Sequence, residues 1–319
     1  MKDKHNPFFT ISLDFELFWG MRDITTLKDY GSNILGGREA IPKILSLFRH
    51  FNINATWAVV GLATFKEKSE MEEYFPSELP KYFDMKLSPY EHFKSIGENE
   101  DEDPFHFGYS LFKLINETPG TEIASHSFSH FYCLEKRRNY KAFKEDLMAS
   151  KKALNRLDVD PKTYIFCRNQ YSLEDLKDLK DLGFEVFRGN ENTPFSHPKV
   201  GNFKRALRLS DSYIDLSGNN SFYPGKEESL VNIPASRFLR PASSSPLENF
   251  RLSRIKKSMT EASLEGKGYH LWWHPHNFGN NIDVNISFLT QILEHFLILK
   301  KKYNMQSLNM KQSAQSTYF

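Results

Sequence analysis

Apolar residues along this chain follow two patterns, short runs rich in β-formers and longer stretches with helical spacing. The short runs predict strands over residues 8–13, 55–61, 163–167, 184–189 and 269–273. The helical spacing predicts helices over residues 40–51, 140–157, 173–182, 252–264 and 286–302. Because the two kinds of segment alternate, the pattern favours parallel strands joined by right-handed helical crossovers, as in a barrel or a doubly wound sheet.

Two stretches break the alternation. Residues 65–119 consist of charged and aromatic pieces, and we interpret them as an insertion that is either a lid or a solvated surface segment. Residues 190–246 are rich in Ser, Asn and Pro around one predicted strand, 230–234. We therefore predict a single domain over 1–319, with the insertion inside it and a C-terminal helix and tail at 286–319.

Polar side chains gather where the predicted strands end. The four clusters are Asp14 with Glu16, His126 with His130, Arg168 with Tyr171, and His274 with His276. In parallel α/β folds the carboxyl ends of the strands share one edge, and ligands bind there. We therefore expect these side chains to lie together in one site.

Two of the pairs have spacings that suit a shared ligand. Asp14 and Glu16 point to the same side if the strand continues through them, because side chains alternate with a period of two; otherwise they form a solvent-facing strand end. His126 and His130 are four residues apart, so on a helical turn they share one face and can chelate a metal. Among eleven histidines such a pair also arises by chance, so its context decides.

Composition narrows the class of protein. Hydrophobic residues make up 39% of the 319 positions and 28 are phenylalanines, which is enough for a large core. The net charge of +2 gives no electrostatic reason to expect a nucleic-acid partner. No apolar run approaches the ~18 residues that span a bilayer, and the first residues lack the apolar core of a signal peptide. The chain has only two cysteines, so we expect reduced thiols. From these features together we expect no transmembrane segment and a cytoplasmic location.

The ordered motifs resemble the polysaccharide deacetylase family, the metal-dependent sugar N-deacetylases with a NodB homology domain. The resemblance covers most of the chain, from Thr10 to about Asn277. Its matching segments are residues 10–16, 54–61, 122–130, 168–171 and 271–274. It implies a distorted (β/α) barrel of seven or eight strands, with the insertion between the second strand and the His-x3-His motif.

The resemblance also implies a metal centre. Two histidines and one carboxylate are a common ligand set for catalytic Zn²⁺, and Glu16, His126 and His130 are the predicted ligands of a divalent ion, with Zn²⁺ as the first candidate. Asp14 would then act as the general base. The two acids could exchange roles, because Phe15 separates them here, whereas the common family motif has adjacent acids.

The remaining roles follow from the same resemblance. Arg168 would hold Asp14 in its ionised form. The backbone amide of Tyr171 would help to hold the oxyanion. His274 would protonate the departing amine, and His276 is the competing candidate for that role.

This chain departs from the family pattern in two further places. Asn169 and Gln170 replace the usual prolines between the arginine and the tyrosine of the third motif. No fourth motif is recognisable at 187–193, so one wall of the site is left unassigned.

We therefore expect a hydrolase that removes an N-acetyl or similar acyl group from an amino sugar in a saccharide, a lipid-linked sugar or a nucleotide-linked sugar. A cytoplasmic location favours such precursors over an assembled cell-wall polymer. Two alternatives stay open at this point. One is a metal-dependent amidohydrolase of small non-sugar amides, and the other is a non-catalytic carbohydrate-binding relative.

Overall fold

The structure is a computed structural model that describes residues 6–137, 139–191 and 209–318. Its strands are β1 (Phe8–Phe15), β2 (Ala55–Val59), β3 (Thr121–Ser125), β4 (Thr163–Tyr164), β5 (Val186–Phe187), β6 (Gly225–Glu227), β7 (Leu230–Asn232), β8 (Arg237–Phe238), β9 (Gly268–Trp273) and β10 (Gln306–Ser307). Its helices are α1 (Leu27–Phe51), α2 (Lys68–Glu72), α3 (Pro89–Phe93), α4 (Tyr109–Asn116), α5 (Ala142–Asn155), α6 (Leu173–Asp181), α8 (Glu248–Glu265), α9 (Ile282–Tyr303) and α10 (Met310–Tyr318). Short 3₁₀ turns are η1 (Leu17–Gly20), η2 (Gly61–Thr64), η3 (Met85–Leu87), η4 (Cys167–Asn169) and η5 (Pro275–Phe278).

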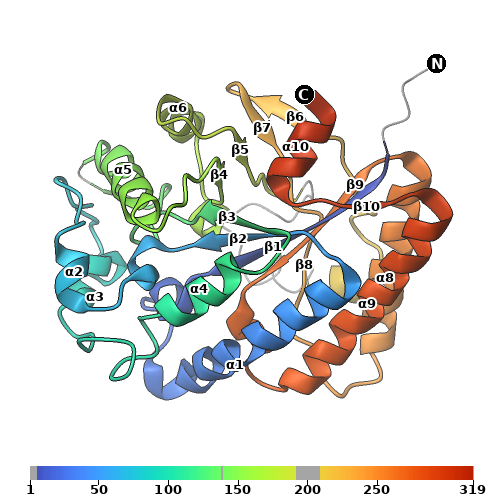
Figure 1. Cartoon of the computed structure of the whole chain (residues 1–319), viewed down its shortest axis with the longest axis horizontal. Helices are drawn as coiled ribbons and strands as arrows, with labels where there is room; N and C mark the ends of the chain where they lie inside the picture. Colours follow the sequence, from blue (N-terminus) through green and yellow to red (C-terminus); the bar gives the residue numbers. More distant parts are fainter. Residues whose placement is uncertain (1–5, 138, 192–208, 319) are drawn as a thin grey trace.

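The strands form one twisted sheet in the order β6-β7-β5-β4-β3-β2-β1-β9-β8. All neighbours in it are parallel except the β6–β7 hairpin, and β10 adds a short parallel pairing to β1. Helices cover its outer face, with α1, α8 and α9 grouped beside the long strands β1 and β9 (Figure 1). This arrangement confirms the predicted α/β class.

The segment 230–239 joins the two ends of the sheet. The Ala235 N–H donates to the Gly189 carbonyl beyond β5, whereas the N–H of the next residue, Ser236, donates to the His270 carbonyl in β9. The single extended segment that carries β7 and β8 therefore pairs first with one edge strand and then with the other. The result is a distorted barrel with seven strand positions, as the sequence predicted.

Side chains of β1 show how the barrel is filled. Its outward residues Phe9, Ile11, Leu13 and Phe15 are buried in the layer of apolar side chains shared with the helices. Its inward residues Thr10, Ser12 and Asp14 are polar and equally buried. Period-two alternation thus separates an apolar layer outside the barrel from a polar column inside it, and Asp14 stands at the carboxyl end of that column.

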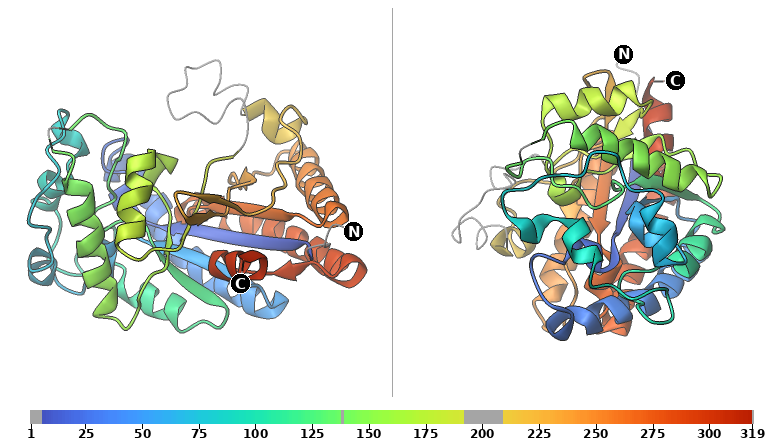
Figure 2. Two further views of the ribbon diagram at one scale, coloured as in Figure 1. Left: turned by 90° about the horizontal axis from the view of Figure 1, so that it is seen from above. Right: turned by 90° about the vertical axis from the view of Figure 1, so that its left-hand side faces the viewer.

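The C-terminal residues close the opposite end of the barrel. The first N–H groups of α10 donate to the barrel interior, Met310 to the Thr56 hydroxyl at 2.9 Å and Lys311 to the Glu122 carboxylate at 3.0 Å. Burial raises the pKa of Glu122. The sequence analysis anticipated only a tail here. The start of β1 and helix α10 lie on the side away from α2 and α3 (Figures 1 and 2).

Helix α1 is longer than its apolar spacing predicted. It begins at Leu27, where the Thr26 hydroxyl accepts a hydrogen bond from the Asp29 N–H, so Pro42 lies inside the helix and not in its first turn. Gly36 and Gly37 hid the helical pattern in the sequence. A β-carbon on Gly37 would stand 2.7 Å from the His276 Cα, so the glycine allows η5 to pack directly on α1.

Helix α9 is the one helix among the described residues that is long and apolar enough to cross a membrane by those two criteria. No apolar run of that length was recognised in the sequence. One side of the helix packs against α1 and α8 and is fully or almost fully buried. That side consists of Phe288, Leu289, Ile292, Leu293 and Phe296. The helix thus contributes a core face to the barrel.

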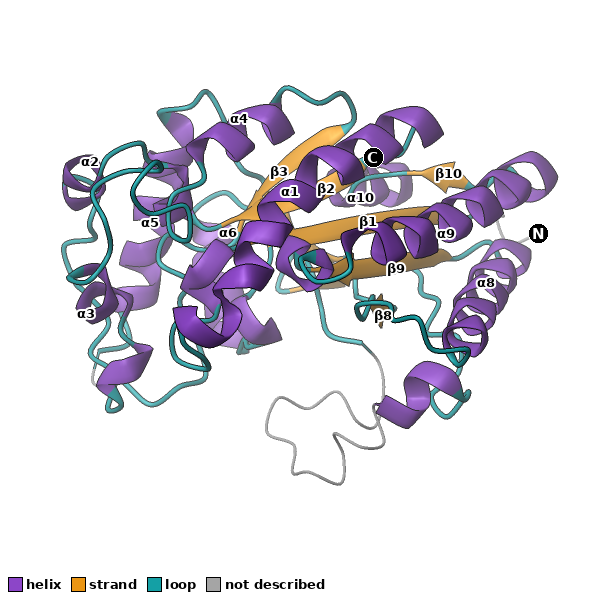
Figure 3. Cartoon of the chain, turned by 90° about the horizontal axis from the view of Figure 1, so that it is seen from below, coloured by secondary structure: helices purple, strands orange, loops and turns teal. Residues whose placement is uncertain are grey.

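The segment 65–119 contains α2, η3, α3 and α4, and α2 and α3 lie at the end toward which β1 runs (Figures 2 and 3). It contacts the turn that follows β1. The Trp19 indole N–H donates to the His106 carbonyl at 2.9 Å, and the Arg22 guanidinium donates to the Leu87 carbonyl at 2.6 Å. The segment therefore supports the residues next to the barrel mouth from outside.

Candidate metal and catalytic site

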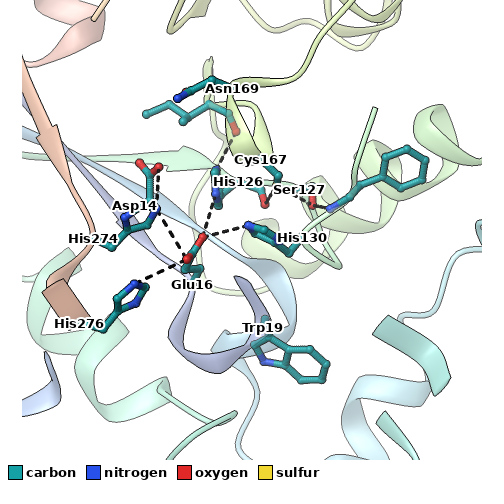
Figure 4. Close-up of polar contacts among 12 residues, drawn as sticks. Asp14, Glu16, Trp19, His126, Ser127, His130, Cys167, Asn169, His274 and His276 are labelled. Carbon is teal, nitrogen blue, oxygen red and sulfur yellow. Dashed lines mark hydrogen bonds and ion pairs between the residues drawn. The ribbon is translucent and has the colours of Figure 1, made fainter. Parts of the chain in front are cut away.

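Three of the four predicted polar clusters meet at the carboxyl ends of the strands. Asp14 lies near the end of β1 and Glu16 directly follows it, His126 and His130 follow β3, and His274 and His276 follow β9. Figure 4 shows the histidine rings from the two sides directed at the Glu16 carboxylate. The expectation of one shared site is met by these side chains, while Arg168 lies nearer the rim.

The Glu16 carboxylate is the centre of the cluster. Its Oε2 atom lies 2.9 Å from His130 Nε2 and 3.4 Å from His126 Nε2. Its Oε1 atom lies 3.6 Å from His274 Nε2 and 4.0 Å from His276 Nε2. Burial raises the pKa of Glu16, but the charges of His274 and His130 and the close contact with the His126 imidazole lower it by more, so the pKa of Glu16 lies well below the usual range.

The residues fit a divalent metal. His126 Nδ1 faces the Ile165 carbonyl at 2.8 Å, which leaves the lone pair of Nε2 free to bind an ion. That Nε2 atom is buried and has no hydrogen-bond partner, an arrangement that a bound cation would satisfy. The Glu16 oxygen on the same side completes a donor set of two imidazoles and one carboxylate.

Two groups of side chains are close enough to hold an ion. One consists of His126, His130 and Cys167, and the other of Glu16, His274 and His276; within each group the donor atoms lie within 4.8 Å of one another. The sequence analysis did not single out Cys167. Its signal in the sequence was its position two residues after Ile165 on a predicted strand, which directs both side chains inward.

The histidine pair does not lie on a helix, which corrects the expected geometry. Residues 126–130 form an irregular loop in which Ser127 and His130 have positive φ values of 63° and 56°. The loop is held by α5, where the buried Asp146 accepts hydrogen bonds from the Phe128 N–H at 2.8 Å and from the Ser129 hydroxyl. Convergence of the two rings thus depends on a tertiary contact.

Asp146 gives the loop a pH-dependent support. Burial raises the pKa of Asp146 to about 7, against the lowering effect of its hydrogen bonds from Ser129 and Phe128. A group with a raised pKa in the folded state stabilises the fold below its unfolded pKa, and that contribution disappears as the pH rises through the folded value.

We expect Asp146→Asn to remove this dependence, because asparagine keeps an acceptor oxygen for the Phe128 N–H but cannot ionise. Between about pH 5 and about pH 8 the wild type should lose roughly 2 to 3 kcal/mol of stability relative to the variant. Urea unfolding of both proteins at the two pH values measures this. A difference in free energy of unfolding that stays constant with pH would contradict a protonated Asp146.

Asp14 pairs with an arginine that the sequence analysis did not predict. Both oxygens of Asp14 accept hydrogen bonds from Arg188, each at 2.7 Å, and both side chains are buried. The same guanidinium donates to Ser12 at 3.0 Å and to Asn169 at 3.2 Å. Burial raises the pKa of Asp14, but the charges of Arg188 and His126 lower this pKa by more, so its net shift is downward.

Arg168 was predicted to hold Asp14. This prediction is wrong, because the carboxylate that Arg168 binds is a different one. The Arg168 guanidinium binds Asp23 at 2.6 Å and lies 4.1 Å from the centroid of the Tyr132 ring. The Tyr132 hydroxyl donates to the same Asp23 carboxylate. The backbone explains the difference, since Arg168 has a positive φ of 54° in the middle of η4 and is about one quarter exposed, whereas Arg188 is buried beside β5.

Arg188 comes from the stretch in which a fourth motif was sought. That stretch, 187–193, ends in two residues that lie outside the described part of the chain. Arg188 directly follows β5, near the end of the predicted strand 184–189. That position at a strand end was the signal available in the sequence. The guanidinium also lies 4.3 Å from the centroid of the Trp272 ring.

His274 and His276 have different surroundings although their rings are stacked with centroids 4.9 Å apart. The His274 side chain is 21% exposed, and its Nε2 atom lies 3.7 Å from Asp14 Oδ2. His276 is buried, and burial together with the charge of His274 lowers the pKa of His276 to about 3. At neutral pH His276 is therefore uncharged.

Tyr171 lies beside the site with its ring stacked on Phe166. Burial raises the pKa of its hydroxyl. The predicted role of its backbone amide stays a prediction.

The barrel of parallel strands is a fold that solved polysaccharide deacetylase structures share. No family model matches the sequence, and no curated protein matches it. Solved structures do show the fold. A Mycobacterium smegmatis protein assigned as a polysaccharide deacetylase has a TM-score of 0.61 at 15% identity, over 99% of this chain and 92% of that one.

Glycan-processing barrels are also similar. The α-amylase AmyC from Thermotoga maritima has a TM-score of 0.54 at 10% identity, over 98% of this chain and 75% of that chain. The branching enzyme of Pyrococcus horikoshii has a TM-score of 0.53 at 11% identity, over 97% and 70%. At these identities the similarity concerns the fold. It confirms the resemblance drawn from the motifs at that level.

Proposed function

We propose that this protein is a metal-dependent hydrolase that removes an N-acetyl or similar acyl group from an amino sugar in a saccharide or a glycoconjugate precursor. The observation that carries the proposal is the Glu16 carboxylate between His126 and His130, with the unpartnered Nε2 atom of His126 directed into the same space. An ionised Asp14 stands beside this donor set but has both oxygens on Arg188.

These contacts support different roles for Glu16 and Asp14. Glu16, His126 and His130 would hold the ion, for which Zn²⁺ is the first candidate. When bound, a divalent metal supplies a Lewis acid that polarises the amide carbonyl and lowers the pKa of a water molecule. Asp14 is left as the general base, because Arg188 occupies its oxygens and keeps it ionised.

The other residues complete the hydrolysis. Asp14 accepts a proton from the attacking water, and His274 donates a proton to the amine nitrogen as the carbon–nitrogen bond breaks, which yields a free amine and a carboxylic acid. His274 suits this role better than His276, because it is partly exposed and faces both acids while His276 is buried and uncharged. The backbone amide of Tyr171 would help to hold the oxyanion.

The aromatic side chains beside His274 support the proposal of a sugar substrate. Phe238 and Trp272 lie side by side, with ring centroids 4.7 Å apart, and each is partly exposed next to His274. Pockets for organic ligands commonly combine such aromatic walls with a few polar groups. Arg168, held by Asp23, adds a cation at the rim that can bind a substrate oxygen.

Glycoside hydrolysis, suggested by the amylase-like neighbours, fits the site less well. Retaining and inverting glycosidases need one carboxylic acid that stays protonated until it reaches the leaving group. Here the net pKa shift is downward for both Asp14 and Glu16, so neither carboxyl is set up to donate a proton.

We expect the zinc-loaded protein to release acetate from an acetylated amino sugar, tested with chito-oligosaccharides, a nucleotide-linked and a lipid-linked N-acetylhexosamine. The His274→Ala variant should keep its metal and lose roughly 10²- to 10⁴-fold in rate, because general acid catalysis is removed. Assays for the released acetate and for the new amine measure the activity of the wild type and of the variant.

The controls separate the alternatives. A larger loss in His276→Ala than in His274→Ala would reverse the assignment of the acid. Release from small amides but from none of the sugars would indicate an amidohydrolase. Tight metal binding without any release would indicate a non-catalytic binding protein and overturn the proposal.

A further inference from the structure

Cys167 lies at the barrel mouth, beside the candidate metal ligands. In β4 the Thr163 hydroxyl bonds to the buried Glu122, and Ile165, just beyond the strand, joins the apolar cluster inside the barrel. Cys167 then begins η4, is 1% exposed and packs in a small cluster with Tyr132.

The thiol faces the histidine loop. The Cys167 sulfur and one ring nitrogen from each of His126 and His130 lie within 4.8 Å of one another. Its hydrogen-bond geometry is weak, with the sulfur 3.4 Å from the His126 carbonyl oxygen and 3.8 Å from the Ser127 hydroxyl. A buried thiol with such loose partners is free to turn toward an ion.

A second observation points to the same space. His126 is 1% exposed, and its Nε2 atom has no hydrogen-bond partner, although its Nδ1 atom is fixed by the Ile165 carbonyl. The unpartnered nitrogen and the sulfur thus belong to residues that follow the neighbouring parallel strands β3 and β4, which are paired at Ser125 and Tyr164.

We propose that Cys167 is a fourth protein donor to the metal, a thiolate that joins Glu16, His126 and His130. This inference rests on the proposed function for the existence of the metal centre and adds the identity of one ligand. When the ion binds, the sulfur–hydrogen bond breaks, the proton passes to solvent and a sulfur–metal bond forms, so charge and atoms balance.

The chemical consequence is metal selectivity. Thiolate is a soft ligand that favours Zn²⁺ and similar thiophilic ions, whereas Mg²⁺ and Ca²⁺ prefer oxygen donors. Zinc centres can expand from four to five ligands, so four protein donors still leave room for one exogenous group.

Cobalt substitution tests the ligand directly. We expect the protein titrated with Co²⁺ to show visible ligand-field absorption and, in addition, a near-ultraviolet sulfur-to-cobalt charge-transfer band. The Cys167→Ser variant should lose the charge-transfer band and keep the ligand-field absorption, because Glu16, His126 and His130 remain. Cys133→Ser is the matched control, since Cys133 is the other buried cysteine and packs in a separate apolar cluster, and its spectrum should match the wild type.

The outcomes separate this inference from the function on which it rests. Ligand-field absorption without a charge-transfer band in the wild type would overturn the Cys167 ligand and leave the metal site intact. No cobalt absorption in the wild type would overturn the metal centre itself. If Cys167→Ser does not fold, X-ray absorption of the zinc-loaded wild type decides, with a zinc–sulfur shell at ~2.3 Å expected and a shell of nitrogen and oxygen alone contradicting the proposal.

Discussion

Replacing Arg188 with alanine is expected to lower turnover by roughly 10²- to 10⁴-fold, the range of a lost general base, and to destabilise the fold by about 3 to 5 kcal/mol, the usual effect of breaking a buried ion pair. Arg188 is the bidentate partner of Asp14, and its removal leaves a carboxylate buried without its counter-charge. Steady-state acetate release and urea unfolding measure the two effects.

The pH profile gives a sharper readout than the rate alone. The charge of Arg188 lowers the pKa of Asp14, so the base stays ionised as the pH falls. In Arg188→Lys the bidentate contact is lost while a charge remains, and we expect the acid limb of the kcat/KM profile to move to higher pH.

Arg168→Ala is the matched control, because Arg168 was the arginine that the motif order assigned to Asp14. Its guanidinium binds Asp23, so the variant should leave the acid limb in place and retain most of the wild-type stability. An upward shift of that limb in Arg168→Ala, with none in Arg188→Lys, would restore the sequence-based assignment and refute the contact seen here.

Replacing His126 with alanine is expected to abolish stoichiometric metal binding. The imidazole supplies the unpartnered Nε2 atom, and only Glu16 and His130 of the predicted set would remain. His130→Ala should behave in the same way. Metal content after treatment with a chelator and reloading, measured by mass spectrometry, gives the result directly.

Asp14→Asn is the comparison for this test. Because Asp14 is bonded to Arg188 and not to the histidines, the variant should reload with metal to the wild-type level and lose turnover. In contrast to Asp14→Asn, the Glu16→Gln variant should bind metal with reduced affinity. Full metal occupancy in His126→Ala, or loss of metal in Asp14→Asn with retention in Glu16→Gln, would overturn the ligand assignment.

The sequence predicted most of the scaffold because its signals are local. Apolar spacing located α5, α6, α8 and α9 to within a few residues, and β-rich runs located β1, β2 and β9. Where the local signal is weak, the prediction failed. Gly36 and Gly37 concealed the first half of α1, and the polar residues of β10 and α10 looked like a tail.

The same distinction applies to the site. The sequence predicted a single site because its polar residues lie at or just after the ends of strands, and parallel strands end at one edge. These residues are Asp14, Glu16, His126, His130 and His274. Which acid faces which partner could not be read in that way. Two arginines follow strands, and the choice between them depends on the direction of their side chains across the barrel.

The sequence by itself determined an α/β fold with acids and histidines at one edge of its parallel strands, because period-two and helical patterns and strand ends are properties of neighbouring residues. The tertiary structure alone decided that Arg188 binds Asp14, that Asp146 shapes the histidine loop, and that Cys167 faces the same space as His126. These contacts join residues from different strands and helices, so only the packed barrel sets the distances between them.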